Sequence, residues 1–242
     1  MATLTAHPEV RLAKLPRLYV TQHLESGAVI KLDAGQSHYL KNVLRREAGD
    51  ELRLFREDDG EFRCVMLPWQ KKREAALVSI EELIRPHEVP SVHLDLYFCL
   101  LSKRQRLKLL LEKASELGAS VLQPLWSQNT QDKGTHASLA AWRRQLVESA
   151  EQSERMDVAH LQDPVMALSA LLDGWAPDGS KLLVCRERSQ QGEARPLLTA
   201  VQENLRRERG TGEGSRISLL VGPEGGFTQA SHRGGSNSGS RA

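Results

Sequence analysis

The second part of the chain alternates between apolar strands and amphipathic helices, and this alternation restricts the fold more than any other feature. Strands are predicted at Val92–Leu101, Val121–Leu125, Lys181–Cys185 and Arg216–Val221. Apolar residues at helical spacing predict helices over Leu107–Leu117, Leu139–Ala150 and Leu197–Arg206. Strands that alternate with helices need crossover connections, so we expect a largely parallel sheet and an α/β fold here.

The N-terminal part has a different rhythm, because short strand-like runs follow one another. These runs are Arg17–Val20, Ala28–Leu32, Glu51–Phe55, Glu61–Leu67 and Ala75–Ile80. Asp58-Asp59-Gly60 lies between two of them, and Asp-Gly in that position indicates a hairpin. A single short helix is predicted over Ser37–Arg46, with Ser37 as its N-cap. We expect a small β-barrel over residues 1–84, a Pro-containing linker at 85–90 and an α/β domain over residues 85–228.

Composition excludes several classes of protein. The 242 residues are 40% hydrophobic and 26% charged, which is typical of a globular chain. No apolar run is long enough to cross a membrane, and the first ten residues lack the pattern of a secretory signal. The three cysteines are widely spaced, which argues against a disulfide framework or a CxxC zinc site. We expect a cytoplasmic protein without a metal centre.

Basic residues gather in three short clusters although the net charge is only +2. The clusters are Arg45-Arg46, Lys71-Lys72-Arg73 and Lys103-Arg104-Gln105-Arg106. Each could be an ordinary solvated face, but together they favour a polyanionic partner such as RNA. His38, Lys41, Arg45 and Arg46 lie on the one predicted helix of the barrel, so they are candidate RNA contacts.

A glycine-rich turn follows directly on the last predicted strand. Leu220 and Val221 end the strand, and Gly222-Pro223-Glu224-Gly225-Gly226 follows. Ligands of α/β proteins bind at the carboxyl ends of parallel strands, and glycines let the backbone approach a ligand closely. The alternative is a tight turn without a ligand. The pattern is not a dinucleotide or P-loop fingerprint, which disfavours a nucleotide-dependent oxidoreductase.

A polar face is predicted near the end of the Leu139–Ala150 helix. Glu148, Gln152 and Arg155 are spaced so that a continuing helix would place them on one side. An amide and a guanidinium on one face can bind a planar polar ligand such as a base edge. The alternative is a solvated face with ion pairs, for example between Glu151 and Arg155.

Taken in order along the chain, these motifs resemble the family of ribosomal RNA small subunit methyltransferase E. The matching segments are Arg17-Leu18-Tyr19, His38, Val43-Leu44-Arg45, Gly49-Asp50, Lys113–Gly118, Glu148–Arg155 and Gly222–Phe227. The resemblance implies a PUA-like β-barrel for RNA, followed by a SPOUT methyltransferase domain with a trefoil knot. It also implies S-adenosylmethionine as cofactor, a homodimer, and methylation of N3 of a uridine in 16S ribosomal RNA of the small subunit.

The resemblance also assigns roles to residues. It implies that Gln152 and Arg155 face the target base, and that His38, Lys41, Arg45 and Arg46 hold RNA. The implied cofactor site comprises Glu187, Leu220, Val221, Gly222, Pro223, Glu224, Gly225 and Gly226.

Residues 229–242 depart from the family pattern. They contain no Leu, Ile, Val, Met or aromatic residue, so we expect a disordered tail in place of the knot-closing segment. Two functions therefore stay open. One is an active rRNA methyltransferase, and the other is a catalytically impaired RNA-binding protein of the same fold.

Overall fold

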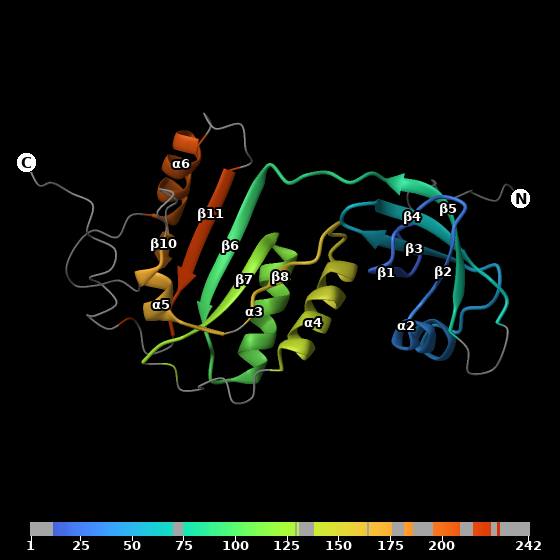
Figure 1. The fold of residues 1–242 in the computed structure, drawn as a ribbon, viewed down its shortest axis with the longest axis horizontal. Helices are drawn as coiled ribbons and strands as arrows, with labels where there is room; N and C mark the ends of the chain where they lie inside the picture. The colour runs from blue at the N-terminus through green and yellow to red at the C-terminus, as the bar shows by residue number, and fades with distance from the viewer. Residues whose placement is uncertain are drawn as a thin grey trace, which may run out of the picture. The chain divides into compact units, whose positions relative to one another are not determined.

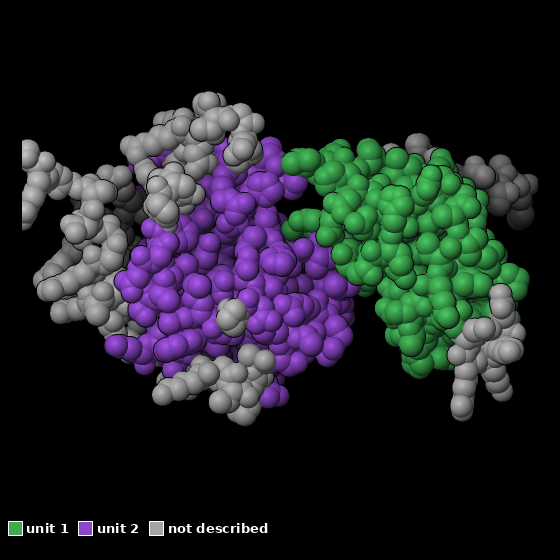
Figure 2. Space-filling model, in the orientation of Figure 1, with its two compact units in different colours: residues 1–89, 150–157 green, residues 90–149, 158–242 purple. Residues whose placement is uncertain are grey.

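The structure is a computed structural model that describes residues 12–69, 75–128, 130, 138–163, 165–175, 182–185, 196–208, 215–223 and 227. The chain forms two compact units, shown in different colours in Figure 2. Residues 1–89 and 150–157 form the first, here called the barrel unit. Residues 90–149 and 158–242 form the second, here called the α/β unit.

The barrel unit is built on a curled, mixed sheet of five strands in the order β1-β3-β4-β5-β2 (Figure 1). The strands are β1 Arg17–Tyr19, β2 Val29–Lys31, β3 Glu51–Arg56, β4 Gly60–Met66 and β5 Leu77–Arg85. The predicted hairpin is present, since β3 and β4 pair antiparallel across residues 57–59. β1 pairs parallel to β3, and β5 continues to Arg85, which was predicted to begin the linker.

Apolar side chains alternate along the strands of this sheet and form a hydrophobic core. Leu52, Leu54, Val78 and Ile80 are all at most 1% exposed and belong to one hydrophobic cluster. Leu40, from the helical segment that follows β2, is fully buried in the same cluster. The apolar residues of the short strands thus explain why this part forms a core of its own.

The helical segment begins earlier than predicted and ends earlier too. It consists of α2 Ala34–His38 and the π-helical turn η1 Tyr39–Val43. Asp33 is the N-cap, because its side chain accepts a hydrogen bond from the Gln36 amide at 2.8 Å and Gln36 completes a capping box. The prediction of Ser37 as N-cap is therefore wrong.

Ser37 instead lies inside the helix. Its buried hydroxyl donates to the Asp33 carbonyl at 2.6 Å and accepts from the Ala76 amide at 2.9 Å. Arg45 and Arg46 lie beyond the helical segment, and Arg45 has a φ of 53°. The prediction that both arginines share a helix with His38 and Lys41 is also wrong, because the helix stops at Val43.

The α/β unit has the predicted parallel sheet, in the order β10-β11-β6-β7-β8 (Figure 1). Its strands are β6 Val92–Cys99, β7 Ala119–Trp126, β8 His160–Leu161, β9 Met166–Ala167, β10 Leu182–Cys185 and β11 Ser215–Val221. Its helices are α3 Arg104–Glu116, α4 Leu139–Gln152, α5 Leu168–Asp173 and α6 Leu197–Glu208. The short elements β8, β9 and α5 were not predicted, because two to six residues carry too little periodicity.

Helices cover both faces of this sheet. Phe98 packs in a cluster with Leu111 of α3 and Leu146 of α4, whereas its neighbour Cys99 packs in another cluster with Leu168 of α5. Consecutive strand residues point to opposite faces, so the two clusters lie on opposite sides of the sheet. No helix in the described residues is long and apolar enough to cross a membrane.

Gly60, the first residue of β4, is a position that only glycine fits. Its φ is +101°, and an added Cβ would lie 2.6 Å from the Arg85 carbonyl oxygen. Gly49 has a similar φ of +87° but nothing within 4 Å of an added Cβ.

We expect Gly49→Ala to lower the free energy of unfolding by about 1–2 kcal/mol through backbone strain. Gly60→Ala should cost at least about 1 kcal/mol more, because the strand must also move. Urea unfolding of the two variants checks this, and equal losses would contradict it.

Candidate functional site

Helix α4 ends at Gln152, three residues before Arg155. Glu154 has a φ of 58°, which turns the chain away from the helix axis. Gln152 is exposed, and Arg155 lies past the turn. The predicted single helical face of Glu148, Gln152 and Arg155 is therefore wrong. The physical cause is a cluster of charged side chains that holds residues 150–157 within the barrel unit.

Glu61 of β4 is the centre of this cluster. The residue is 2% exposed, and three guanidinium groups surround its carboxylate. The Arg17 Nε lies 2.8 Å from Oε1, the Arg53 Nη1 lies 3.1 Å from Oε1, and the Arg85 Nη2 lies 3.2 Å from Oε2. The Arg17 guanidinium also lies 3.6 Å from the centre of the Phe55 ring. A buried carboxylate is thus fully paired.

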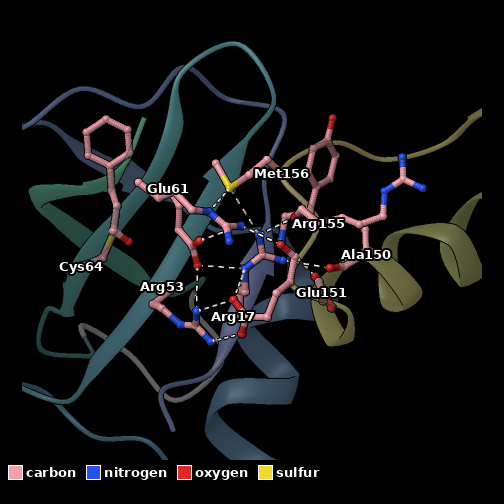
Figure 3. Close-up of polar contacts among 12 residues, drawn as sticks. Arg17, Arg53, Glu61, Cys64, Ala150, Glu151, Arg155 and Met156 are labelled. Atoms are coloured by element: carbon pink, nitrogen blue, oxygen red, sulfur yellow. Dashed lines mark hydrogen bonds and ion pairs between the residues drawn. The ribbon is translucent and has the colours of Figure 1, made fainter. Parts of the chain in front are cut away.

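The same arginines bind the turn after α4. Figure 3 shows the Arg17 guanidinium between Glu61 and the Ala150 carbonyl, to which its Nη1 donates at 2.9 Å. Its Nη2 donates to the Arg155 carbonyl. Arg53 donates to both carboxylate oxygens of Glu154, at 2.8 and 2.7 Å. The turn is therefore held through its backbone and through one side chain.

Neighbouring contacts reinforce this arrangement. The Tyr19 amide donates to the Glu151 carboxylate at 2.9 Å, and the Arg85 Nη2 donates to the Glu154 carbonyl at 2.7 Å. The hydrogen bonds from Arg53, with the nearby arginine charges, lower the pKa of Glu154. Burial lowers the pKa of Arg17, although Glu61 opposes this effect.

Arg155 has its own carboxylate partner. Its Nε and Nη2 donate to the two oxygens of Asp157, at 3.1 and 2.7 Å, and its side chain is 9% exposed. A guanidinium held in this forked geometry keeps its charge and its orientation. Such a group can complement negative charge that develops on a bound base.

A pocket of about 670 Å³ lies beside α2 and η1 in the barrel unit. Its lining residues are Gln22, Lys31, Leu32, Asp33, Ala34, Ser37, His38, Lys41, Asn42 and Ala75. The pocket brings together two of the four predicted RNA contacts, His38 and Lys41. The other two, Arg45 and Arg46, are not among its lining residues.

Lys31 and Asn42 also line this pocket, although they were not among the predicted RNA contacts. Asn42 is next to Lys41 and four residues after His38, so helical spacing could have indicated it. Lys31 comes from β2, and no local pattern connects that strand with the helix. The Lys41 Nζ lies 4.3 Å from the centre of the Trp69 ring, a cation–π contact.

The candidate cofactor loop begins at the end of β11. Leu220 is 1% exposed and packs in the cluster with Cys99 and Leu168. An added Cβ at Gly222 would lie 2.8 Å from the Phe227 ring, so the chain after the strand returns close to its own backbone. β11 lies between β6 and β10, with both pairings parallel. The loop thus starts at the carboxyl end of a parallel strand, as predicted, and this is the edge at which α/β proteins generally bind ligands.

Part of this candidate site falls outside the described residues. Leu220, Val221, Gly222 and Pro223 are described, whereas Glu187, Glu224, Gly225 and Gly226 are not. The tail at residues 229–242, predicted to be disordered, also lies outside the described residues. No cluster of three or more potential metal ligands occurs among the residues that the structure describes.

The pairing of Glu61 makes a measurable prediction. Glu61→Gln would leave three guanidinium groups around a neutral amide, and loss of one partner of a buried ion pair costs about 3–5 kcal/mol. Glu82→Gln is the matched control, because Glu82 has a 65% exposed side chain and pairs with Arg63 at 3.5 Å. An exposed pair contributes at most about 1 kcal/mol. Hydrogen exchange of the β3 and β4 amides measures both effects, and similar losses for the two variants would refute the assignment.

Two family models and several known proteins are similar to this chain. The model of an RNA methyltransferase domain matches residues 88–233, and that of an RNA methyltransferase PUA domain matches residues 32–74. The ribosomal RNA small subunit methyltransferase E of Bacillus subtilis is 27% identical over 86% of this chain and 79% of its own length. The protein of the same name from Rickettsia conorii is 26% identical over 89% of this chain and 80% of its own length.

Solved structures show the same fold. A protein from Legionella pneumophila, solved with the cofactor S-adenosylmethionine, superposes with a TM-score of 0.72 at 23% identity. The match covers 95% of this chain and 91% of that one. The ribosomal RNA small subunit methyltransferase E of Neisseria gonorrhoeae, bound to S-adenosylmethionine, gives 0.71 at 23% identity over 91% and 84% of the two chains. The predicted resemblance is confirmed, and so is the predicted fold class of a PUA-like barrel followed by an α/β methyltransferase domain; the trefoil knot stays a prediction.

Proposed function

Since this chain belongs to the RNA methyltransferase domain family, we propose that it methylates N3 of a uridine in the 16S ribosomal RNA of the small subunit, with S-adenosylmethionine as methyl donor. The observation that carries the proposal is the pair of family matches, one on each unit. The PUA match includes the helical segment of the pocket, and the methyltransferase match includes the glycine loop.

The residues at the end of β11 suit the methyl donor. The backbone at Gly222 carries no side chain where a Cβ would meet Phe227. Tyr97, Trp175 and Phe227 pack against the adjoining cluster, which offers an apolar aromatic surface for an adenosyl group. The described residues Leu220 to Pro223 would border the adenosyl group. We assign Glu187 and the segment Glu224–Gly226 to the same site. When bound, S-adenosylmethionine supplies an electrophilic methyl group.

The pocket beside α2 suits an RNA strand. Lys31, His38 and Lys41 offer cationic or protonatable side chains for phosphates, and Asn42 offers an amide for a base edge. Arg45 and Arg46 extend the basic surface past the helical segment, and we assign them phosphate contacts as well.

Methylation at N3 requires that the N3 proton leaves and that the charge developing on the uracil is met by donors. We assign this second task to Arg155, which Asp157 orients, with the exposed amide of Gln152 reading the base. N3 lies on the pairing edge of uracil, so the target nucleotide must be unpaired or turned out of its stack. We further propose that the chain acts as a homodimer, as the family resemblance implies.

The proposal is tested by adding the protein and radiolabelled S-adenosylmethionine to small subunits that lack the methyl group. We expect label in 16S rRNA, and no label with subunits that already carry the modification. Calorimetry with S-adenosylmethionine alone distinguishes an active methyltransferase from the alternative, a catalytically impaired RNA-binding protein. RNA binding without cofactor heat and without label would favour that alternative and overturn the proposal.

Arg155→Ala tests the role of the held guanidinium. A donor that meets charge only in the transition state should cost about 10²–10³-fold in kcat when removed. Arg143→Ala is the control, because Arg143 lies on helix α4, before the turn that carries Arg155, and has a 51% exposed side chain paired with Asp163. The measurement is the single-turnover rate, with cofactor affinity determined separately. A loss confined to cofactor affinity would contradict the assignment.

Lys41→Ala tests the pocket. Loss of one phosphate contact should lower the slope of log affinity against log salt by about 0.7–0.9. The exposed Lys14, which is not among the lining residues of the pocket, provides the control Lys14→Ala. Filter binding of 16S rRNA fragments over a range of salt concentrations gives both slopes. Equal slopes for Lys41→Ala and the unmodified protein would remove Lys41 from the interface.

A further inference from the structure

We propose that Arg17 is a positioning residue: it holds the turn after α4 in the conformation in which Gln152 and Arg155 act on the target base. The inference rests on the proposed function, because it concerns the residues assigned to the base. Arg17 lies on β1, far from this turn in the sequence, so it would be an additional residue that supports the turn.

The geometry of one guanidinium carries this inference. Arg17 donates to the carbonyls of both Ala150 and Arg155, which lie on either side of Gln152 in the sequence. A planar fork that binds two carbonyls fixes their separation, and so fixes the course of the chain between them. The turn therefore closes around Arg17, and Figure 3 shows the guanidinium in contact with both partners.

Arg17 is itself held from three sides. Its Nε donates to Glu61 at 2.8 Å, its guanidinium lies over the Phe55 ring at 3.6 Å, and its Nη2 contacts the Met156 sulfur at 3.8 Å. The side chain is 3% exposed. A group with this little freedom can serve as a rigid support for the turn, as a precise active site requires.

The contacts of Arg17 differ from those of Arg53. In the turn, Arg53 donates hydrogen bonds only to the Glu154 carboxylate, whereas Arg17 donates hydrogen bonds to the backbone and lies 3.8 Å from that carboxylate as an ion pair. Glu154 has a φ of 58°, which glycine adopts without strain. Glu154→Gly therefore removes the side-chain contact and leaves the two backbone contacts in place, which separates charge pairing from positioning.

The test compares Arg17→Lys, Arg17→Met, Glu154→Gly and the control Arg63→Lys. Lysine keeps the charge but loses the fork, and methionine keeps a similar length without leaving an unpaired cation. Arg63 pairs with Glu51 at 3.2 Å and has a 29% exposed side chain. Two readouts are collected on the full chain: hydrogen exchange at residues 151–155 and in β3 and β4, and single-turnover methyl transfer to undermethylated subunits.

We expect both Arg17 variants to speed exchange at residues 151–155 by about tenfold or more, and by clearly more than in β3 and β4, where loss of the ion pair with Glu61 has its own effect. The kcat should fall by about 10–100-fold, because small misplacements of a reacting group have effects of this size. The KM for subunits should stay within about threefold, because the pocket residues are untouched. Glu154→Gly and Arg63→Lys should keep kcat within about threefold.

Three outcomes would overturn the proposal. They are unchanged exchange at residues 151–155 in both Arg17 variants, an unchanged kcat despite faster exchange, and a loss of protection that extends equally through β3 and β4. If the unmodified chain transfers no methyl group at all, the proposed function fails. Exchange at residues 151–155 then decides by itself whether Arg17 holds the turn.

Discussion

The pairing of the buried Glu61 carboxylate with arginines is the interaction on which the position of residues 150–157 depends. Three guanidinium groups have this carboxylate as a counterion, those of Arg17, Arg53 and Arg85, and all three also bind residues at the end of α4 or in the turn after it. Residues 150–157 group with the barrel unit although the helix that precedes them packs in the α/β unit. The arginines that pair with this buried charge on β4 therefore also hold the candidate base-binding residues in the barrel unit.

Because of this grouping, each of the two units carries a different part of the candidate site. The barrel unit holds the basic pocket and the turn that carries Gln152 and Arg155. The α/β unit holds the start of the loop after β11, where the Phe227 ring lies against the backbone of Gly222. In the proposed function, the residues assigned to RNA and to the base therefore belong to one core, and those assigned to the methyl donor belong to another. The proposed reaction needs both, because the base and the methyl carbon must be aligned for transfer.

Periodicity in the sequence predicts most of this fold, but it does not predict the charged cluster. All the strands except β8 and β9, and the long helices α3, α4 and α6, follow from local apolar spacing. Asp33 was missed as N-cap because Ser37 is an equally good capping residue, and only the capping box with Gln36 distinguishes them. The end of α4 was missed because its cause is long-range: Arg17 and Ala150 are 133 residues apart in sequence. Residue types at local spacing cannot show such a pair.

The identity of the methylated atom tests the central claim most directly. Small subunits that lack the modification are incubated with the protein and S-adenosylmethionine, and their 16S rRNA is digested to nucleosides. Chromatography with mass detection then separates the isomeric methyluridines. The account predicts 3-methyluridine at one site, formed only when protein and cofactor are both present. A methyl group on C5 or on the ribose, or no methyluridine at all, would contradict it.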